Sequence, residues 1–154
     1  MNLSALDEQY MREALQQADL ASEKGEVPIG AVAVLDGCVV AKAYNIREAN
    51  HNPLGHAEIL LLQELSQQLQ SWRLDQVTIY VTCEPCLMCA GAMLQARIPR
   101  VVYGCKDPKA GACGSLYDVT QDKRLNHQIE LKAGVLEREC AQKLSEFFRK
   151  LRRS

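Results

Sequence analysis

The chain has 154 residues, of which 47% are hydrophobic and 24% are charged, so its composition is that of a folded globular protein rather than a disordered chain. The formal net charge is −1, which excludes a polycation, and any contact with a nucleic acid must come from a local basic patch. Seven cysteines are many for this length, and an odd number cannot all pair within the chain. The cysteine count indicates either a partly paired disulfide framework or reduced thiols, some of them metal ligands.

The N-terminal segment favours reduced thiols. Residues 1–24 contain five acidic residues and lack a basic start followed by an apolar stretch, so we expect no secretory signal. The longest nearly apolar stretch, residues 29–35, is too short to cross a bilayer. We therefore expect a cytoplasmic protein without a membrane anchor, in which clustered cysteines bind metal more often than they pair.

Helices and strands alternate in the first half of the chain. Apolar residues at helical spacing predict a helix over about residues 5–24. Two strands are predicted over residues 29–35 and 38–41, because an Asp-Gly sequence typical of a tight hairpin turn lies between them. A strongly apolar helical pattern follows over about residues 56–69.

The second half continues the alternation. Small apolar residues over 86–96 predict a helix that is buried on most of its sides. A loop rich in Gly and Lys runs from residue 106 to about 125, and a last amphipathic helix covers about residues 137–154. Three further strands are expected over residues 77–82, 100–104 and 129–131.

The order of these elements predicts a single α/β domain over residues 1–154. Helices should cover both faces of a mixed sheet. We expect the first two strands to be antiparallel, and the later strands to be parallel with right-handed crossovers, because helices connect them.

Two short segments that open helices contain the residues suited to metal and acid–base chemistry. Cys86 and Cys89 are three residues apart, so both thiols lie on one face of a first helical turn that Pro85 starts. The partial positive charge of a helix N-terminus favours thiolates there. With His56 they give three zinc ligands and leave the fourth tetrahedral position open, as in catalytic zinc sites. Glu58, two residues after His56, is a candidate base that does not bind the metal.

Two other interpretations of the cysteines remain at this point. Cys86 and Cys89 can be a buried structural pair, because free cysteine is common in protein cores. With Cys83 they also resemble an iron–sulfur ligand run, but position 93 is Met and a fourth cysteine at a suitable spacing is missing. The remaining four cysteines are expected to be core or loop thiols: Cys38, Cys105, Cys113 and Cys140.

The spacing His-x-Glu … Pro-Cys-x-x-Cys matches the signature of zinc-dependent deaminases. Over nearly its whole length the chain also resembles the bacterial tRNA-specific adenosine deaminases. The Asn-His pair and the Phe-Phe-Arg sequence near the C-terminus narrow the resemblance to the tRNA branch. Two departures are Leu54-Gly55, where many members have Thr-Ala, and Cys83, where Leu is common. The matching stretches are residues 26–32, Asn45, 51–53, 56–58, 84–93, 97–98, 111–118, 126–127 and 147–149.

The resemblance implies a fold, a reaction and an assembly. The fold would be the three-layer α/β/α cytidine deaminase-like fold with a mixed five-stranded sheet. The reaction would be hydrolytic deamination of the wobble adenosine of a tRNA anticodon stem-loop to inosine. One Zn²⁺ per subunit would activate the water that attacks C6 of adenine, and Glu58 would shuttle the protons. Family members are homodimers with active sites near the interface.

The resemblance also implies contacts with the substrate. Asn45 resembles the residue that hydrogen-bonds the flipped base, although a plain turn residue is the alternative for an Asn after a strand. Pro28 and Ile29 would form a wall of the pocket, with Ala57 beside the metal ligand. Asp107 resembles a residue near the substrate ribose and backbone.

Charge is distributed unevenly along the chain. Residues 1–26 contain six acidic and two basic residues, a balance of −4, whereas residues 143–154 contain five basic and one acidic residue, a balance of +4. A basic end can contact the phosphates of an anticodon loop, whose unpaired bases are extruded at modest cost. A merely solvated helix end is the alternative. The expected RNA contacts are Phe148, Arg149, Lys150, Arg152 and Arg153, with Phe147 packed against the protein.

Two other functions fit the motif. One is a deaminase of a free nucleobase or nucleotide, such as guanine or cytosine, which has no electrostatic need for a basic Phe-Phe-Arg end. The other is a non-catalytic zinc module that binds RNA, in which Glu58 would have no role in turnover. His51 and His127 are each compatible with an RNA or substrate contact and with a purely local hydrogen bond.

Overall fold

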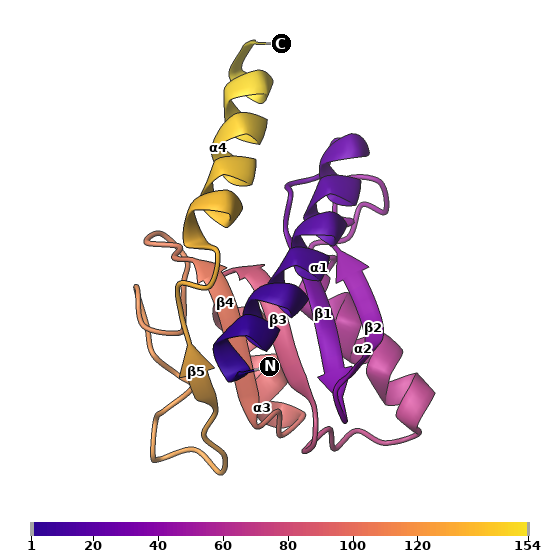
Figure 1. The fold of residues 1–154 in the computed structure, drawn as a ribbon, viewed down its shortest axis with the longest axis vertical. Helices are drawn as coiled ribbons and strands as arrows, with labels where there is room; N and C mark the ends of the chain where they lie inside the picture. Colours follow the sequence, from indigo (N-terminus) through magenta and orange to yellow (C-terminus); the bar gives the residue numbers. More distant parts are fainter. Residues whose placement is uncertain (1, 154) are drawn as a thin grey trace.

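The computed structural model describes residues 2–153, which form a five-stranded sheet with helices on both faces (Figure 1). Met1 and Ser154, the ends of the predicted domain and of its last helix, lie outside the described residues. In chain order the elements are α1 (Leu3–Glu23), β1 (Gly30–Leu35), β2 (Cys38–Tyr44), α2 (Ala57–Leu69), β3 (Thr78–Cys83), α3 (Leu87–Gln95), β4 (Arg100–Cys105), β5 (Glu130–Lys132) and α4 (Glu137–Arg153). No helix among residues 2–153 is long and apolar enough to cross a membrane.

The strand order in the sheet is β2-β1-β3-β4-β5. β1 is antiparallel to both of its neighbours, and β3, β4 and β5 are parallel. The mixed sheet, the antiparallel first pair and the parallel later strands are confirmed. The hairpin turn contains Asp36 and Gly37, both with positive φ, as a two-residue turn with primed geometry requires.

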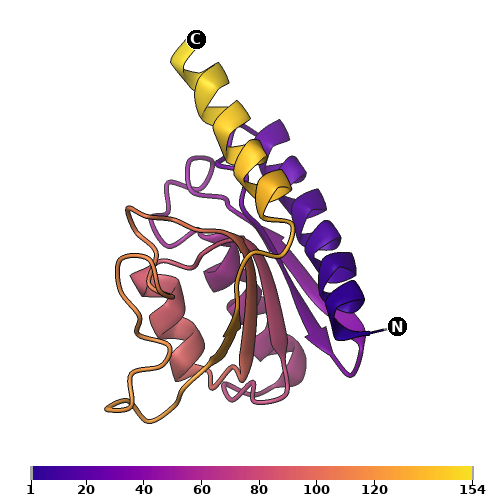
Figure 2. The same ribbon diagram turned by 60° about the vertical axis from the view of Figure 1, so that its left-hand side comes forward.

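The helices form two outer layers. α1 and α4 lie side by side on one face of the sheet, and α2 and α3 lie on the other (Figure 2). The core under α2 and α3 contains Leu61 and Met93, and the core under α1 and α4 contains Met11 and Cys140. α1 lies very close to β1, because a Cβ at Gly30 would be 2.2 Å from the carbonyl oxygen of Ala14. The expected three-layer α/β/α arrangement is therefore present.

The prediction that α3 is buried on most of its sides holds except along one exposed stripe. Cys89, Ala90, Met93 and Leu94 face the core, but Leu87 is 51% exposed. α3 is in an outer layer, so Leu87 and Gln95 are exposed, whereas Met88 and Ala92 are half-buried against the core. The apolar run extends around the helix farther than the contacts with the sheet require.

A buried ion-pair cluster connects α1 to strands β3, β4 and β5. The Asp7 carboxylate accepts hydrogen bonds from Arg100 Nη2 at 2.9 Å, Lys132 Nζ at 2.8 Å and the Tyr80 hydroxyl at 2.6 Å. Burial alone would raise the pKa of Asp7, but the bonds from Arg100, Lys132 and Tyr80 outweigh it and lower the pKa to about 2. The side chain is therefore a carboxylate at neutral pH, and its charge is compensated by cations from β4 and β5.

Candidate metal centre and active site

The sheet topology brings the starts of two helices together. β2 and β3 are each antiparallel to β1, so they point in the same direction. α2 follows β2 and α3 follows β3, so both helices begin at the same edge of the sheet, beyond the carboxyl ends of these strands. His56 immediately precedes α2, and Cys86 immediately precedes α3. The fold thereby joins two motifs that are thirty residues apart in the sequence.

His56, Cys86 and Cys89, the predicted metal ligands, lie together in a group that could hold a metal ion. His56 Nδ1 lies 3.6 Å from Cys86 Sγ and 3.5 Å from Cys89 Sγ, and all three ligand atoms are within 4.8 Å of one another. Tetrahedral zinc, with Zn–S of about 2.3 Å and Zn–N of about 2.0 Å, would place the nitrogen and a sulfur about 3.5 Å apart. The two nitrogen–sulfur distances therefore fit a zinc ion held by these side chains.

The two thiols of this group differ in protonation. The proximity of the two thiols lowers the pKa of Cys86 to about 4 and raises the pKa of Cys89. The hydrogen bond with Cys86 also raises the pKa of His56. The group therefore holds a thiolate at neutral pH, and binding of a cation would displace the protons that remain.

Glu58 lies beside this group, in the first turn of α2. Its side chain is buried, with 4% of the residue exposed, and burial raises the pKa of Glu58 to about 7. The Cys89 thiol is within hydrogen-bonding distance of the Glu58 carboxyl group. A carboxyl group with this pKa can both accept and return a proton near neutral pH.

The segment before α2 joins the predicted base-contacting residues to the metal ligands. Asn45 is buried, and its Oδ1 accepts a hydrogen bond from the Ala57 backbone N–H at 2.8 Å. The Asn45 backbone N–H in turn donates to the Ile29 carbonyl oxygen at 3.1 Å. Pro28, directly before Ile29, is buried. The structure thus connects Ile29, Asn45 and Ala57 in one chain of hydrogen bonds, which ends at the residue directly after His56.

Asp107 lies outside that chain of hydrogen bonds. It is half-buried in the loop after β4, and its Oδ1 accepts hydrogen bonds from the backbone N–H groups of Lys109 and Ala110, both at 3.1 Å. Part of its carboxylate therefore stabilises its own turn.

Two buried carboxylates beside the site were missed by the sequence analysis. Glu26 accepts hydrogen bonds from the backbone N–H groups of residues 47, 48 and 49 at 2.9–3.1 Å, and Glu84 accepts four from the loop after β4. Burial opposes ionisation, but the hydrogen bonds prevail and lower the pKa of both groups. Their only signal in the sequence is a Glu inside each of two stretches that match the deaminases.

The other cysteines lie outside the metal-ligand group. Cys83 is buried in the core under α1 and α4, where its thiol contacts Cys105 on the neighbouring strand β4. Cys113 and Cys140 are buried as expected for core thiols, whereas Cys38 is exposed beside the hairpin turn. All seven cysteines are within the described residues, and all are free thiols.

The two remaining histidines take part in local structure. His51 is exposed and has a φ of 48°, the left-handed conformation of a turn residue. His127 Nε2 is 2.7 Å from the Ile98 carbonyl oxygen, which links the loop before β5 to the segment after α3.

The basic helix α4 extends beyond the sheet to the C-terminus (Figure 1). Phe148 is 40% exposed, and its ring meets the half-buried Phe147 edge-on at 5.4 Å. Arg149, Lys150, Arg152 and Arg153 are exposed. A pocket of about 200 Å³ lies between this end of α4 and the segments that hold Glu26 and Asn45, and it is lined by Gly25, Glu26, Val27, Asn45, Arg47, Glu48, Phe147, Phe148 and Leu151.

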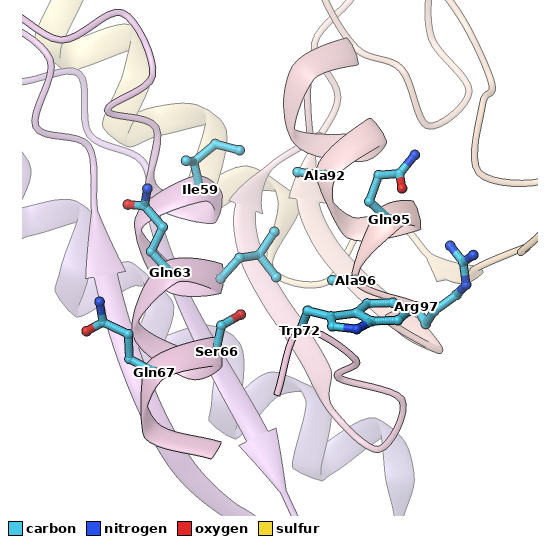
Figure 3. Close-up of a pocket in the computed structure, with 10 residues that line it drawn as sticks. Ile59, Gln63, Ser66, Gln67, Trp72, Ala92, Gln95, Ala96 and Arg97 are labelled. Atoms are coloured by element: carbon cyan, nitrogen blue, oxygen red, sulfur yellow. The ribbon is translucent and has the colours of Figure 1, made fainter. Parts of the chain in front are cut away.

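A wider groove, of about 850 Å³, lies between α2 and α3 on the outer surface (Figure 3). Trp72 is 62% exposed there, and the Arg97 guanidinium lies 6.0 Å from the centre of its ring. None of His56, Glu58, Cys86 or Cys89 lines this groove. It is lined by Ile59, Leu62, Gln63, Ser66, Gln67, Trp72, Ala92, Gln95, Ala96 and Arg97.

A three-layer α/β/α fold with a His/Cys/Cys group and a buried Glu at the starts of two helices defines a zinc-type deaminase. Consistent with this class, the family model for MafB19-like deaminases matches residues 6–152. A solved guanine deaminase from Nitrosomonas europaea has the same fold, with a TM-score of 0.79 at 18% identity over 91% of this chain and 83% of its own.

Closer relatives narrow the class to one family. The chain is 51% identical to a tRNA-specific adenosine deaminase of Bacillus subtilis over 96% of this chain and 91% of the relative. It is 46% identical to one of Haemophilus influenzae, over 97% and 87% respectively. A solved structure of a tRNA:A34 deaminase, from a study of A-to-I editing at the wobble position, has a TM-score of 0.85 at 40% identity and covers 88% of this chain and 99% of its own. The chain belongs to the family of tRNA-specific adenosine deaminases.

Proposed function

We propose that this protein hydrolyses the wobble adenosine of a tRNA anticodon to inosine, with one zinc ion per subunit held by His56, Cys86 and Cys89. The observation that supports this most directly is the ligand group with its buried neighbour Glu58, in a chain 51% identical to a tRNA-specific adenosine deaminase. Three ligands leave one tetrahedral position for water, which is the arrangement of catalytic zinc rather than structural zinc.

Glu58 is the proton carrier of the proposed reaction. Zinc, when bound, would supply Lewis-acid activation of a water molecule at the open ligand position. Glu58 accepts a proton from that water and delivers it to N1 of adenine. The hydroxide oxygen adds to C6, and Glu58 then takes the proton of the new C6 hydroxyl group and gives it to the exocyclic amine. The C6–N bond breaks and the amine leaves as ammonia, so that adenosine and water become inosine and ammonia. A pKa raised by burial to about 7 suits both directions of transfer.

Asn45 orients the base in this proposal. Its Oδ1 is engaged by the Ala57 N–H, so the Nδ2 group is the part of the amide that remains to donate a hydrogen bond to a ring nitrogen of adenine. Pro28 and Ile29 form the adjoining wall, and Asp107 approaches the ribose from the loop after β4. A buried amide that is fixed at one end by the backbone loses little entropy when it binds the base.

The exposed end of α4 binds the RNA strand in this proposal. Arg149, Lys150, Arg152 and Arg153 contact phosphates, and the exposed Phe148 ring stacks on an unpaired base. The pocket that Phe148 shares with Asn45 connects this surface to the base-binding residues. At the acidic end of α1, Asp19 forms an ion pair with Lys143 of α4 at 2.7 Å. Lys143 lies farther from the C-terminus than the basic residues proposed to bind RNA, so this ion pair leaves them available.

We also propose that the groove between α2 and α3 is covered by a second copy of the chain in a homodimer. α2 and α3 present both apolar or small side chains and glutamines there, and Trp72 and Arg97 are residue types enriched at interfaces (Figure 3). Ala92→Arg should convert the dimer to a monomer in sedimentation experiments, whereas Gln9→Arg, on the exposed face of α1, should not. An Ala92→Arg variant that remains dimeric would place the interface elsewhere.

The proposed setting is the cytoplasm, where tRNA is available and thiols stay reduced. All seven cysteines are free, and a thiolate ligand needs a reducing environment to remain one. Retention of zinc by the purified protein only in the presence of a reductant would support this setting.

The direct test measures inosine in an anticodon stem-loop with adenosine at the wobble position, beside ammonia release from free adenine, guanine and cytosine. We expect turnover of the stem-loop only. Glu58→Gln should abolish turnover and retain one zinc ion per chain, and the matched control Glu64→Gln, exposed on the same helix, should keep both. Activity on free bases alone would overturn the proposed substrate, and turnover by Glu58→Gln would overturn the proposed role of Glu58.

A further inference from the structure

The loop between β4 and β5 folds around a single buried side chain. Glu84 is only 3% exposed, and its carboxylate accepts hydrogen bonds from the backbone N–H groups of Asp107 at 3.1 Å, Cys113 at 3.0 Å and Ser115 at 3.1 Å. The Ser115 hydroxyl donates a fourth. In a regular strand or helix, backbone N–H groups bond to backbone carbonyl groups. In this loop they bond instead to the Glu84 carboxylate at the end of β3.

This loop lies against the turn that carries a metal ligand. Gly111 forms an isolated bridge with Cys86, and the Ala112 N–H donates to the Pro85 carbonyl oxygen at 2.9 Å. The approach to Glu84 is so close that a Cβ at Gly111 would lie 2.3 Å from the carboxylate carbon. The arrangement of the loop therefore depends on having the Glu84 carboxylate inside it and no side chain at position 111.

The outer side of the loop is suited to contact a polynucleotide. Lys109, Leu116 and Tyr117 are exposed, and they give a cation and an aromatic ring on the surface next to the metal-ligand group. A loop that is already ordered binds a strand without the entropy loss of ordering on contact. The hydrogen-bond partners of the Glu84 carboxylate are all in this loop, whereas the thiols of Cys86 and Cys89 are carried by the start of α3 and receive no hydrogen bond from Glu84.

We propose that Glu84 is a positioning residue that keeps the 106–118 loop ready to bind RNA. The role rests on the proposed function, because it assigns the loop to substrate binding. Glu84 acts through the loop, so its loss weakens substrate affinity and leaves the metal and the chemical step in place.

Glu84→Gln tests this with little change in size. The amide offers one acceptor oxygen, and its NH₂ group faces N–H donors, so at least one bond to the loop is lost and a donor–donor contact appears. Loss of one bond to a charged group corresponds to about a tenfold increase in KM for the stem-loop. We expect kcat near the wild-type value and one zinc ion per chain by elemental analysis.

Amide hydrogen exchange supplies a measurement that is independent of activity. In Glu84→Gln the amides of residues 107–115 should exchange faster, while those of β3, β4 and α3 should keep their protection. Gly111→Ala reaches the same loop without altering Glu84 and should give the same pattern. Gly91→Ala, where a Cβ meets nothing within 4 Å, is the matched control and should behave as wild type.

The outcomes separate this inference from the proposed function. A wild-type protein that does not deaminate the stem-loop overturns the proposed function, and the exchange experiment still decides whether Glu84 holds the loop. Unchanged exchange in residues 107–115, loss of zinc, or a fall in kcat at constant KM would overturn the positioning role. Faster loop exchange together with raised KM and retained zinc would establish it.

Discussion

Asp7→Asn tests how much the buried ion-pair cluster contributes to folding. Asp7 is fully buried in α1, and its carboxylate accepts hydrogen bonds from Arg100 on β4, Lys132 on β5 and Tyr80 on β3. Asparagine has nearly the same size but carries no charge, so Arg100 loses its buried partner and Lys132 its only hydrogen-bonded carboxylate among the described residues. The substitution therefore removes the charge compensation and leaves the packing nearly unchanged.

The pKa of Asp7 gives the magnitude. A reduction from the ordinary value of 3.8 to about 2 corresponds to about 2.5 kcal/mol of folding free energy at neutral pH, at roughly 1.4 kcal/mol per pKa unit. Because the pKa of the folded state is the lower one, this contribution is complete above about pH 5 and is lost as the pH falls toward 2. In Asp7→Asn, Arg100 and Lys132 also lose a charged partner. We therefore expect the substitution to lower the unfolding free energy at pH 7 by about 3 kcal/mol.

Urea denaturation followed by circular dichroism, repeated from pH 7 to pH 2, measures both effects. We expect the difference in unfolding free energy between wild type and Asp7→Asn to narrow by about 2 kcal/mol over this range, because about half of the Asp7 side chains are still ionised at pH 2. Asp75→Asn, which removes an exposed pair with Arg73, is the control and should change stability by less than about 1 kcal/mol. A loss below about 1 kcal/mol for Asp7→Asn at pH 7, or a difference that does not vary with pH, would refute this reasoning.

Three further predictions concern packing, metal and RNA. Gly30→Ala should lower the unfolding free energy by about 3 kcal/mol or more, because its Cβ would meet the backbone of α1; a thermal melt close to wild type would contradict this close contact. Cys86→Ala should lose zinc and Cys83→Ala should retain it, as measured by elemental analysis, since only Cys86 belongs to the ligand group; zinc loss in both variants would assign Cys83 to the site. Neutralising Lys150, Arg152 and Arg153 together should raise KM for the stem-loop and reduce the slope of log affinity against log salt by about 2, and an unchanged slope would exclude α4 from phosphate contact.

Local patterns predict the elements of this fold well, because each is encoded by nearby residues. The Asp-Gly turn, the helix that begins at the Pro-Cys-x-x-Cys segment and the alternating strand over residues 77–82 all depend on spacing within a few positions. The position of β1 between β2 and β3 has no comparable signal. It depends on which strands pair across the sheet, and that choice is made by the packing of α1 over Gly30 and Val32.

The ligand group was predictable for a related reason, and its surroundings were not. Histidine and two cysteines at fixed spacing have few structural uses in common, so the pattern is informative by itself. Glu26 and Glu84 have no such pattern, because a carboxylate that satisfies loop N–H groups is recognised only when the loop's conformation is known. The exposed stripe of α3 was missed because an apolar sequence does not state whether the chain itself or another molecule covers it.

The same sheet geometry explains why the site has two kinds of acidic residue. Glu58 lies in the first turn of a helix, where burial outweighs the hydrogen bond from its own backbone N–H and raises its pKa to about 7. Glu84 lies one residue beyond β3, where unpaired loop N–H groups converge on it, so hydrogen bonding dominates and lowers its pKa. Both side chains are almost completely buried, with exposures of 4% and 3%. The number of hydrogen-bond donors around each carboxyl group therefore decides its role. Glu58 is able to carry a proton, whereas Glu84 stays charged and holds a loop.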